Sequence, residues 1–192
     1  MNTSSTKQAA PVPLSDPWYH TFHDLMPCRV REILLVSSPY DAYILEEDGR
    51  LTERIFTEYS ELNLSTSPRI THVSTAARAF ELMKQRRFDL VMTMVRIADT
   101  DVSGFAREVK TKYPDMPVVL LVLTEGDLLH LPGGIDSLAI DYVFWWTGDA
   151  RILLAIVKLV EDKLNAPHDT SRAGVRAIIV VEDSVRRYSS FL

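Results

Sequence analysis

The sequence is poor in the features that mark secreted, membrane and nucleic-acid-binding proteins. It has one cysteine among 192 residues, so no internal disulfide can form, and we expect a reducing, cytoplasmic location. No apolar run approaches the roughly 18 residues of a membrane span, and the amino terminus lacks the basic and then apolar pattern of a signal peptide. The net charge of −5 argues against a nucleic-acid backbone as ligand, because such binding requires a clustered basic surface. We therefore expect neither a membrane nor a nucleic acid as partner.

The remaining composition, 46% hydrophobic and 24% charged, is that of an ordinary globular domain with appendages. Residues 1–15 mix Ser, Thr, Ala and Pro without periodicity, which predicts a disordered leader. A helix-start signal and helical apolar spacing then predict a short amino-terminal helix over residues 16–28. The polar stretch NAPHDTSRAG, which begins at Asn165, predicts a linker over residues 166–174. These boundaries leave one main domain over residues 29–165 and a short final segment, 175–192.

Strand-like and helix-like stretches alternate along the main domain. Apolar runs predict strands at Ile33–Val36, Arg69–Val73, Phe88–Met94, Pro117–Leu123 and Tyr142–Trp145, with helices over residues 40–62, 75–86, 104–113 and 149–164. Parallel strands need crossover helices, which cover both faces of the sheet. The pattern therefore predicts a three-layer α/β fold built on a (βα)5 parallel sheet.

Four segments carry a resemblance to a known family. They are ILLV, FDLVMTM followed by ADTDVSGF, MPVVLLVLT, and IDYVFWW followed by GDARILLAIVKLVED. Through them, residues 31–164, about two-thirds of the chain, resemble the receiver domain of two-component response regulators. The resemblance implies a flavodoxin-like fold and a place in two-component signal transduction, a phosphorelay.

The residues at the receiver's reactive positions do not have the chemistry that the resemblance implies. A working receiver needs an acidic pair after its first strand, an aspartate ending its third, and a lysine after its fifth, which together hold Mg²⁺ and neutralise the transferring phosphoryl group. Here Ser37 and Ser38 stand at the positions of the acidic pair, Met94 at that of the phosphoacceptor and Trp145 at that of the lysine. Thr124, near the end of the fourth strand, is the one site residue of the family that this sequence keeps. Hydroxyls carry no charge to hold Mg²⁺, and a thioether cannot accept the phosphoryl group. We expect a non-catalytic pseudo-receiver without metal or cofactor in this domain.

Two other interpretations of the same region stay open. A shifted alignment would make Asp99 or Asp101 the phosphoacceptor of an active receiver. The fold also suits a flavodoxin-like binder of a small ligand, with Tyr142, Trp145 and Trp146 stacking on a ring, although SSPYDA after the first strand is no glycine-rich phosphate loop.

Because Trp145 and Trp146 are adjacent, one side chain is expected to face the core and the other the surface through which receivers usually signal. With the helix over residues 149–164 they form a candidate interaction surface. Its partner would be another protein, downstream domains of the same chain, or a second copy in a homodimer. The alternative is that both rings fill space vacated by the missing charged residues.

The final segment, VRAIIVVEDSVRRYSSFL, resembles the opening strand and first helix of a second, truncated receiver. Glu182 and Asp183 stand at its acidic pair, so Mg²⁺ is expected there only if that receiver is complete. The alternative is an extra strand and short helix that dock on the first domain. Together with GDARILLAIVKLVEDKLNAPHD, this segment also resembles the amino-terminal region of large bacterial proteins that join receivers to a pyruvate phosphate dikinase-like, phosphoenolpyruvate-binding domain.

Overall fold

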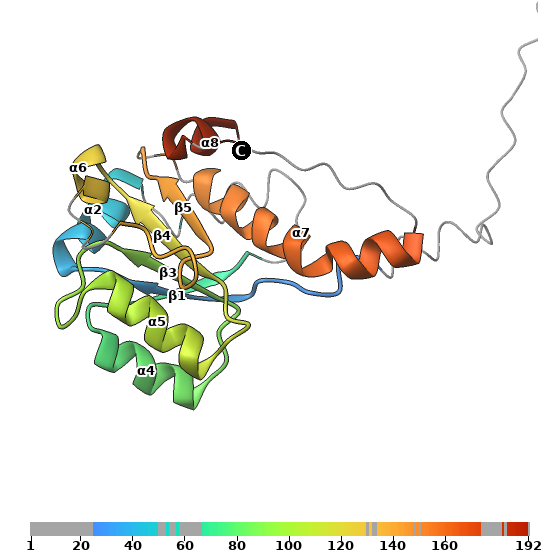
Figure 1. Ribbon diagram of the computed structural model, residues 1–192, viewed down its shortest axis with the longest axis horizontal. Coiled ribbons are helices and arrows are strands. Elements are labelled where there is room, and N and C mark those ends of the chain that lie inside the picture. The colour runs from blue at the N-terminus through green and yellow to red at the C-terminus, as the bar shows by residue number, and fades with distance from the viewer. Residues whose placement is uncertain are drawn as a thin grey trace, which may run out of the picture.

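The computed structural model describes residues 25–49, 53, 57, 67–129, 131, 134–147, 149, 151–173, 182 and 184–191 (Figure 1). The elements are, in chain order, β1 (Glu32–Val36), α2 (Pro39–Gly49), β2 (Arg69–Val73), α4 (Ala76–Gln85), β3 (Leu90–Met94), α5 (Val102–Lys112), β4 (Val118–Val122), α6 (Glu125–Leu129), β5 (Tyr142–Trp145), α7 (Arg151–Ala173) and α8 (Val185–Phe191). Among the described residues, no helix has the length and apolar character needed to cross a membrane.

The sheet has five strands in the order β2-β1-β3-β4-β5, and every described pairing is parallel. Helices α2 and α7 cover one face and α4 and α5 cover the other, as Figure 1 shows. The predicted three-layer (βα)5 fold is confirmed. It also has the flavodoxin-like order in which the chain reverses direction beside β1.

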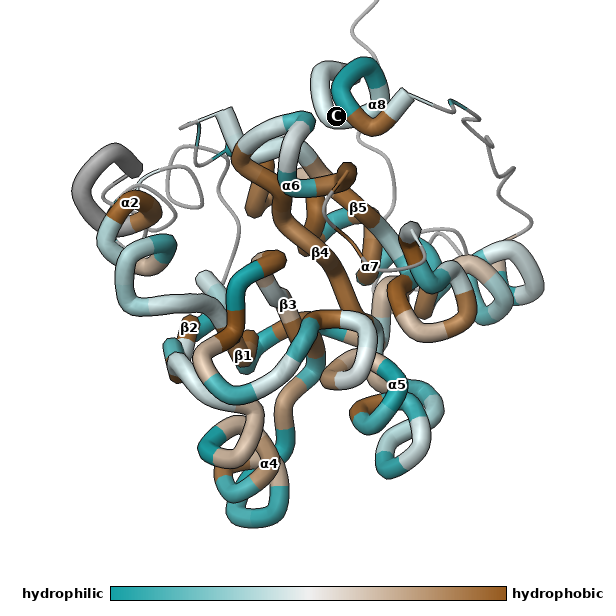
Figure 2. Tube along the Cα trace, turned by 60° about the vertical axis from the view of Figure 1, so that its left-hand side comes forward, coloured by the Kyte–Doolittle hydropathy of each residue, from teal (hydrophilic) through white to brown (hydrophobic). Residues whose placement is uncertain are grey.

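The central strands are apolar on both sides because helices bury both of their faces. All five residues of β3 and of β4 are buried, whereas the edge strand β2 has two exposed residues. Alternate residues of each strand enter separate cores, and Figure 2 shows the resulting hydrophobic centre with hydrophilic stretches on the surrounding helices.

Helix α6 was not predicted from the sequence. It has only five residues, and none of them is buried, so it leaves no apolar periodicity to detect. Its start is fixed by polar contacts between Thr124 and Asp127. The Thr124 hydroxyl accepts a hydrogen bond from the Asp127 N–H, and the Asp127 carboxylate accepts from the Thr124 N–H at 2.9 Å. This reciprocal arrangement is a capping box.

Helix α7 corrects the predicted linker, because it continues unbroken from Arg151 to Ala173 and includes residues 166–173. Two of the polar residues that suggested a linker, Asn165 and Asp169, lie against the segment Met26–Val30. The backbone N–H groups of Met26, Cys28 and Val30 donate hydrogen bonds of 3.0, 2.8 and 3.0 Å to the side chains of Asp169, Asn165 and Glu161. Two residues of extended chain span about 6.8 Å and four residues of helix about 6 Å, so alternate N–H groups match acceptors one turn apart.

The same segment corrects part of the predicted amino-terminal helix. Residues 26–28 are not helical, and residues 16–24 of that prediction lie outside the described residues, as does the predicted leader. Residues 50–62 of the predicted second helix also fall almost entirely outside them. The described part, α2, begins at Pro39, one residue before the predicted start.

Asp141, at the start of β5, provides a pH-dependent contribution to stability. Burial tends to raise its pKa, but hydrogen bonds from the Lys110 ammonium at 2.6 Å and the Val118 N–H at 2.8 Å lower it overall. A carboxyl group with a lowered pKa stabilises the fold above its unfolded pKa and loses that contribution as the pH falls through its folded pKa.

We therefore expect Asp141→Asn to cost about 1 kcal/mol at neutral pH and progressively less between about pH 5 and pH 2. Urea titrations of both proteins across that range measure the difference. Other acidic groups titrate equally in the two proteins, so they cancel. Parallel pH profiles would show that the Asp141 carboxylate contributes nothing.

Candidate functional site

The carboxyl edge of the sheet brings the predicted site residues into one region. Ser37 and Ser38 follow β1, Met94 ends β3, Thr124 follows β4, and Trp145 ends β5. The strand pairings place these ends side by side, since Met94 pairs with Leu121 and Val122 with Trp145. Parallel α/β sheets place ligand sites at this edge.

The two serines use their polar groups within the fold. Ser37 is fully buried, and its hydroxyl lies 3.1 Å from Nε2 of His72 on the neighbouring strand β2. Ser38 accepts a hydrogen bond from the Asp41 N–H at 3.1 Å, at the first turn of α2. Its own N–H donates to the Arg96 carbonyl at 2.7 Å. These contacts tie the loops after β1 and β3 together.

Met94 is part of the core and has no reactive group at the edge. Its side chain is 2% exposed and belongs to the cluster beneath α2 and α7, together with Met92 and Leu121. A buried thioether stabilises this end of the sheet by packing.

A cation that the sequence analysis did not identify lies at the same edge. The Arg96 guanidinium contacts the Asp41 carboxylate through two hydrogen bonds, of 3.2 Å from Nε and 2.5 Å from a terminal nitrogen. Its other terminal nitrogen lies 3.7 Å from the Asp127 carboxylate. Asp41 is only 1% exposed, whereas half of the Arg96 side chain is exposed. We call these three residues the edge triplet.

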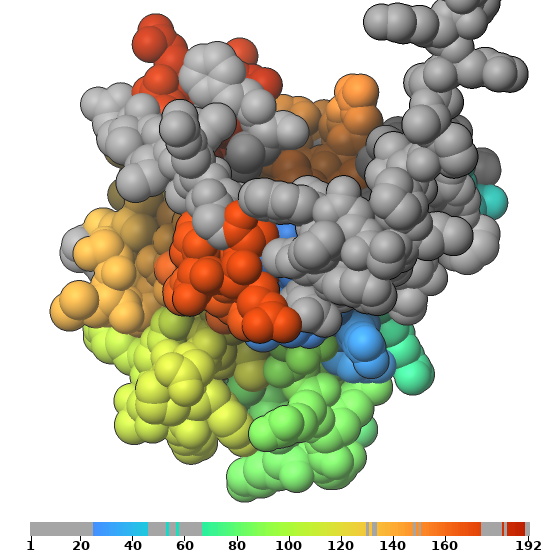
Figure 3. Space-filling model, turned by 90° about the vertical axis from the view of Figure 1, so that its right-hand side faces the viewer, coloured from blue at the N-terminus to red at the C-terminus, as the bar shows by residue number. Residues whose placement is uncertain are grey.

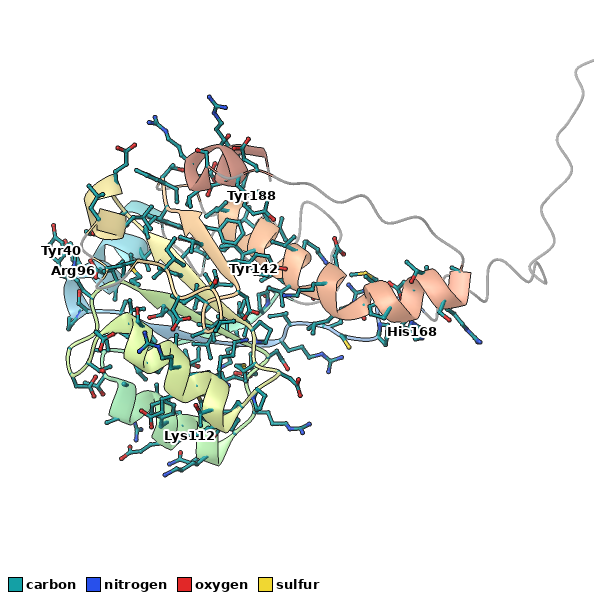
Figure 4. All side chains as sticks on the ribbon, viewed as in Figure 1. Tyr40, Arg96, Lys112, Tyr142, His168 and Tyr188 are labelled. Atoms are coloured by element: carbon teal, nitrogen blue, oxygen red, sulfur yellow. The ribbon has the colours of Figure 1, made fainter. Side chains whose placement is uncertain are left out.

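The edge triplet joins α2, the loop after β3 and α6, and Figure 4 shows Arg96 beside Tyr40 at this end of the molecule. The hydrogen bond to Asp41 raises the pKa of Arg96, so the group stays charged and keeps the nearby carboxylates neutralised. This contact could be predicted only from the order of the strands in the sheet. Once β1 and β3 are known to be neighbours, Asp41 and Arg96, each a few residues past a strand end, are expected to meet.

The donor set at this edge does not fit Mg²⁺, the ion that the receiver fold implies. Mg²⁺ takes oxygen ligands, commonly one or two carboxylates plus waters and phosphate oxygens. Asp41 is paired to Arg96, Asp127 accepts hydrogen bonds from the Leu123 and Thr124 N–H groups, and the serines carry no charge. Throughout the described part of the chain, no three His, Cys, Asp or Glu side chains form a group that could hold a metal ion.

Asp99 and Asp101, the alternative phosphoacceptors, bind backbone groups at helix starts. Asp99 accepts hydrogen bonds from the N–H groups of Ala76 and Ala77, at 2.7 and 3.1 Å, which begin α4. Burial tends to raise the Asp99 pKa, but these hydrogen bonds lower it overall. Asp101 is the N-cap of α5 and accepts from the Gly104 N–H at 2.8 Å. Both lie past the end of β3.

The two tryptophans lie on opposite faces of the sheet, and this corrects half of the predicted interaction surface. Trp146 is 4% exposed and packs in the core with α7, so its ring is not available to a partner. Its Nε1 is buried without a hydrogen-bond acceptor among the described residues. Trp145 is half-buried on the other face, and its backbone N–H donates to the Ser189 hydroxyl of α8 at 2.8 Å.

Helix α8 covers the open edge of β5. The Tyr188 ring stacks on Phe144 with the centroids 5.6 Å apart, and the Arg186 guanidinium lies 5.9 Å from the Trp145 ring. Figure 4 shows Tyr188 above Tyr142, on the side of the sheet where α8 lies. The final helix thus docks on the first domain. The strand predicted in the preceding segment and Asp183 lie outside the described residues, and Glu182 accepts a hydrogen bond from the Ser184 N–H at 3.0 Å.

The three aromatic residues proposed to stack on a ligand ring do not form one site. Tyr142 packs against Phe144 at 6.2 Å on the face that also holds Trp146, whereas Trp145 belongs to the opposite face. The Lys163 ammonium lies 5.0 Å from the Tyr142 ring. The rings are therefore used for packing around β5.

No family model matches the sequence, and no curated protein matches it. Solved structures do match. A signal receiver domain of an HD domain-containing protein from Pseudomonas fluorescens Pf-5 is 16% identical, covers 74% of this chain and 94% of its own, and has a TM-score of 0.51. The response regulator TrrA from Thermotoga maritima, in complex with Mg²⁺ and BeF, is 18% identical, with 68% and 98% covered and a TM-score of 0.51.

A response regulator receiver domain from Methanospirillum hungatei JF-1 is 14% identical, covers 72% of this chain and 98% of its own, and has a TM-score of 0.53. At such identities the likeness concerns the fold. It extends over almost the whole of each receiver domain, and it agrees with the strand order and with the helices on both faces of the sheet. The chain therefore has the fold of a response-regulator receiver domain.

Proposed function

We propose that this chain is a receiver-like signalling module that takes up no phosphoryl group and catalyses no reaction, and that acts through contacts with a protein partner or with other domains of its own polypeptide. The observation that supports the proposal is the set of residues present at the carboxyl edge of the sheet. Uncharged residues stand there at the reactive positions, and the cation at that edge, Arg96, is already paired with Asp41 and Asp127.

The edge triplet supports a module held in a single state. The Arg96 guanidinium, which follows β3, contacts Asp41 of α2 and Asp127 of α6, and Asp41 is almost completely buried. We infer that signalling through this module depends on which partner it contacts.

The β5 edge supports a role in contacts between domains. It already receives a helix from another part of the chain, through Tyr188 on Phe144 and Ser189 on Trp145. If the final segment belongs to a complete second receiver, this edge is where the two receivers meet.

A single exposed thiol, Cys28, is compatible with the reducing cytoplasm in which such modules would act.

A titration with Mg²⁺ and beryllofluoride, followed by amide NMR spectra of the full chain, tests the proposal. We expect no saturable shifts at Ser38, Met94, Arg96 or Thr124, because the Asp41 carboxylate is paired with Arg96 and the Asp127 carboxylate accepts hydrogen bonds from the Leu123 and Thr124 N–H groups. Repeating it with Glu182→Ala separates any site in the final segment, whose shifts alone would disappear. Saturable shifts across the loops after β1, β3 and β4 would overturn the proposal.

A further inference from the structure

Helix α7 has two parts that differ in what covers them. In the first part, Ile152, Ile156 and Val160 belong to an apolar stripe that is buried against the sheet. The second part runs from residue 161 to Ala173. Among the described residues, the two hydrophobic cores include no side chain of α7 after Val160. Figure 1 shows this end of the helix extending past the sheet, so the sheet does not hold it in place.

The end of α7 is instead covered by the segment Met26–Val30, which we call the strap. Three polar residues, Glu161, Asn165 and Asp169, continue the buried stripe of α7, and each accepts a hydrogen bond from a backbone N–H of the strap. Pro27 stands between two of these donors, at a position where an N–H is not used. Figure 3 faces this end of the molecule, with the end of α7 in orange-red and the amino-terminal part in blue beside it.

An open cavity lies between these two elements and the rest of the domain. Its volume is about 790 Å³, and its lining includes Pro27 and Cys28 of the strap, Leu164 of α7, and residues 113–117 in the turn after α5. The Leu164 side chain is 43% exposed. The strap and the end of α7 thus face α5 across a cavity, whereas they contact each other directly.

Each of the two elements is weak without the other. Pro167 lies inside α7, where it lacks the N–H that would donate to the Lys163 carbonyl and its ring crowds that carbonyl. A segment as short as residues 161–173 is only marginally stable as an isolated helix in water. In the strap, Met26 has a φ of 56°, which is unfavourable for a residue with a side chain and persists only where surrounding contacts hold it.

We infer that the strap and the end of α7 form a conformational switch that opens while the sheet stays folded. With the strap bound, residues 161–173 are helical. When the strap is released, they unfold, and the first part of α7 remains on the sheet. The switch couples the chain before residue 25 to the chain after Ala173, because releasing one releases the other. It is independent of the proposed function, since none of its residues belongs to the carboxyl edge.

Amide hydrogen exchange of the full chain, followed by mass spectrometry, tests the inference with two substitutions of Cys28. Cys28→Pro removes the N–H that donates to Asn165, whereas Cys28→Ala keeps it and is the matched control. We expect Cys28→Pro to speed exchange in residues 164–173 about tenfold or more, because a buried acceptor loses its donor. Exchange in residues 152–160 and in β3 and β4 should stay within about twofold of the parent, as should exchange throughout Cys28→Ala.

Pro167→Ala tests the inference in the opposite direction and does not depend on the folding of Cys28→Pro. It supplies the missing N–H within α7, so exchange in residues 164–173 should slow about tenfold. Exchange in the strap should slow with it, because coupling between two elements is reciprocal, while β3 and β4 stay unchanged. Unchanged exchange of residues 164–173 in either variant would overturn the inference. Faster exchange in Cys28→Pro that is spread equally over both parts of α7 and the strands would also overturn it.

Discussion

Replacing Asn165 with alanine is expected to lower the free energy of unfolding by about 3 kcal/mol, because the Asn165 side chain forms hydrogen bonds with both backbone groups of Cys28. Its Oδ1 accepts from the Cys28 N–H and its Nδ2 donates to the Cys28 carbonyl, both at 2.8 Å. Asn165 is fully buried, so truncation leaves both backbone groups without their partner and opens a small void. Urea unfolding of the purified chain measures the loss.

Asp162→Ala is the matched control, because Asp162 is an exposed residue of the same helix, α7. We expect this change to alter stability by no more than about 0.5 kcal/mol. If the two alanine variants were equally stable, the contact between α7 and the segment Met26–Val30 would contribute nothing to the fold.

Removing the Arg96 guanidinium by Arg96→Ala is expected to cost about 2 kcal/mol. The change leaves the Asp41 carboxylate buried without its cation, and breaking a fully buried pair costs roughly 3–5 kcal/mol. Half of the Arg96 side chain is in contact with solvent, which reduces the expected loss. Arg96→Lys should give an intermediate loss, because lysine keeps the charge but not the paired geometry.

The double variant Asp41→Ala/Arg96→Ala completes the cycle for this pair. We expect it to be about as stable as Asp41→Ala alone, because the arginine has lost its main partner in both. Additive losses from the two single changes would mean that Asp41 and Arg96 do not interact, and the edge triplet would then have no structural role.

The sheet could be predicted from the sequence because its strands are short apolar runs. β3 and β4 are buried on both faces, so their sequences are continuously apolar and are readily recognised. The helices that pack on them have apolar residues at helical spacing, as in α4, where Ala76, Ala79, Phe80 and Met83 are buried. The order of these elements then determined the fold class.

The continuation of α7 could not be predicted by the same argument. Asn165 and Asp169 resemble linker residues in composition, but their polarity serves the backbone of a segment more than 130 residues earlier in the chain. Pro167 strengthened the misleading signal, although it is an exposed residue within the helix. A side chain that binds distant backbone leaves no periodic signal.

The edge site was predicted in position but not in its interactions. Ser37, Ser38, Met94, Thr124 and Trp145 follow from the family resemblance, because each occupies a fixed place relative to a strand end. The pair between Asp41 and Arg96 joins residues 55 positions apart, and its detection required the spatial order of the strands. The burial of Trp146 likewise depends on the place of α7.

The proposal that this module takes up no phosphoryl group is tested most directly by incubating the full chain with acetyl phosphate and Mg²⁺ and measuring its intact mass. An unchanged mass is expected, since Met94 cannot form an acyl phosphate and both Asp99 and Asp101 are bound to backbone N–H groups. Asp99→Asn and Asp101→Asn are treated in parallel. A stoichiometric gain of one phosphoryl group in the parent that is lost in either variant would contradict the account.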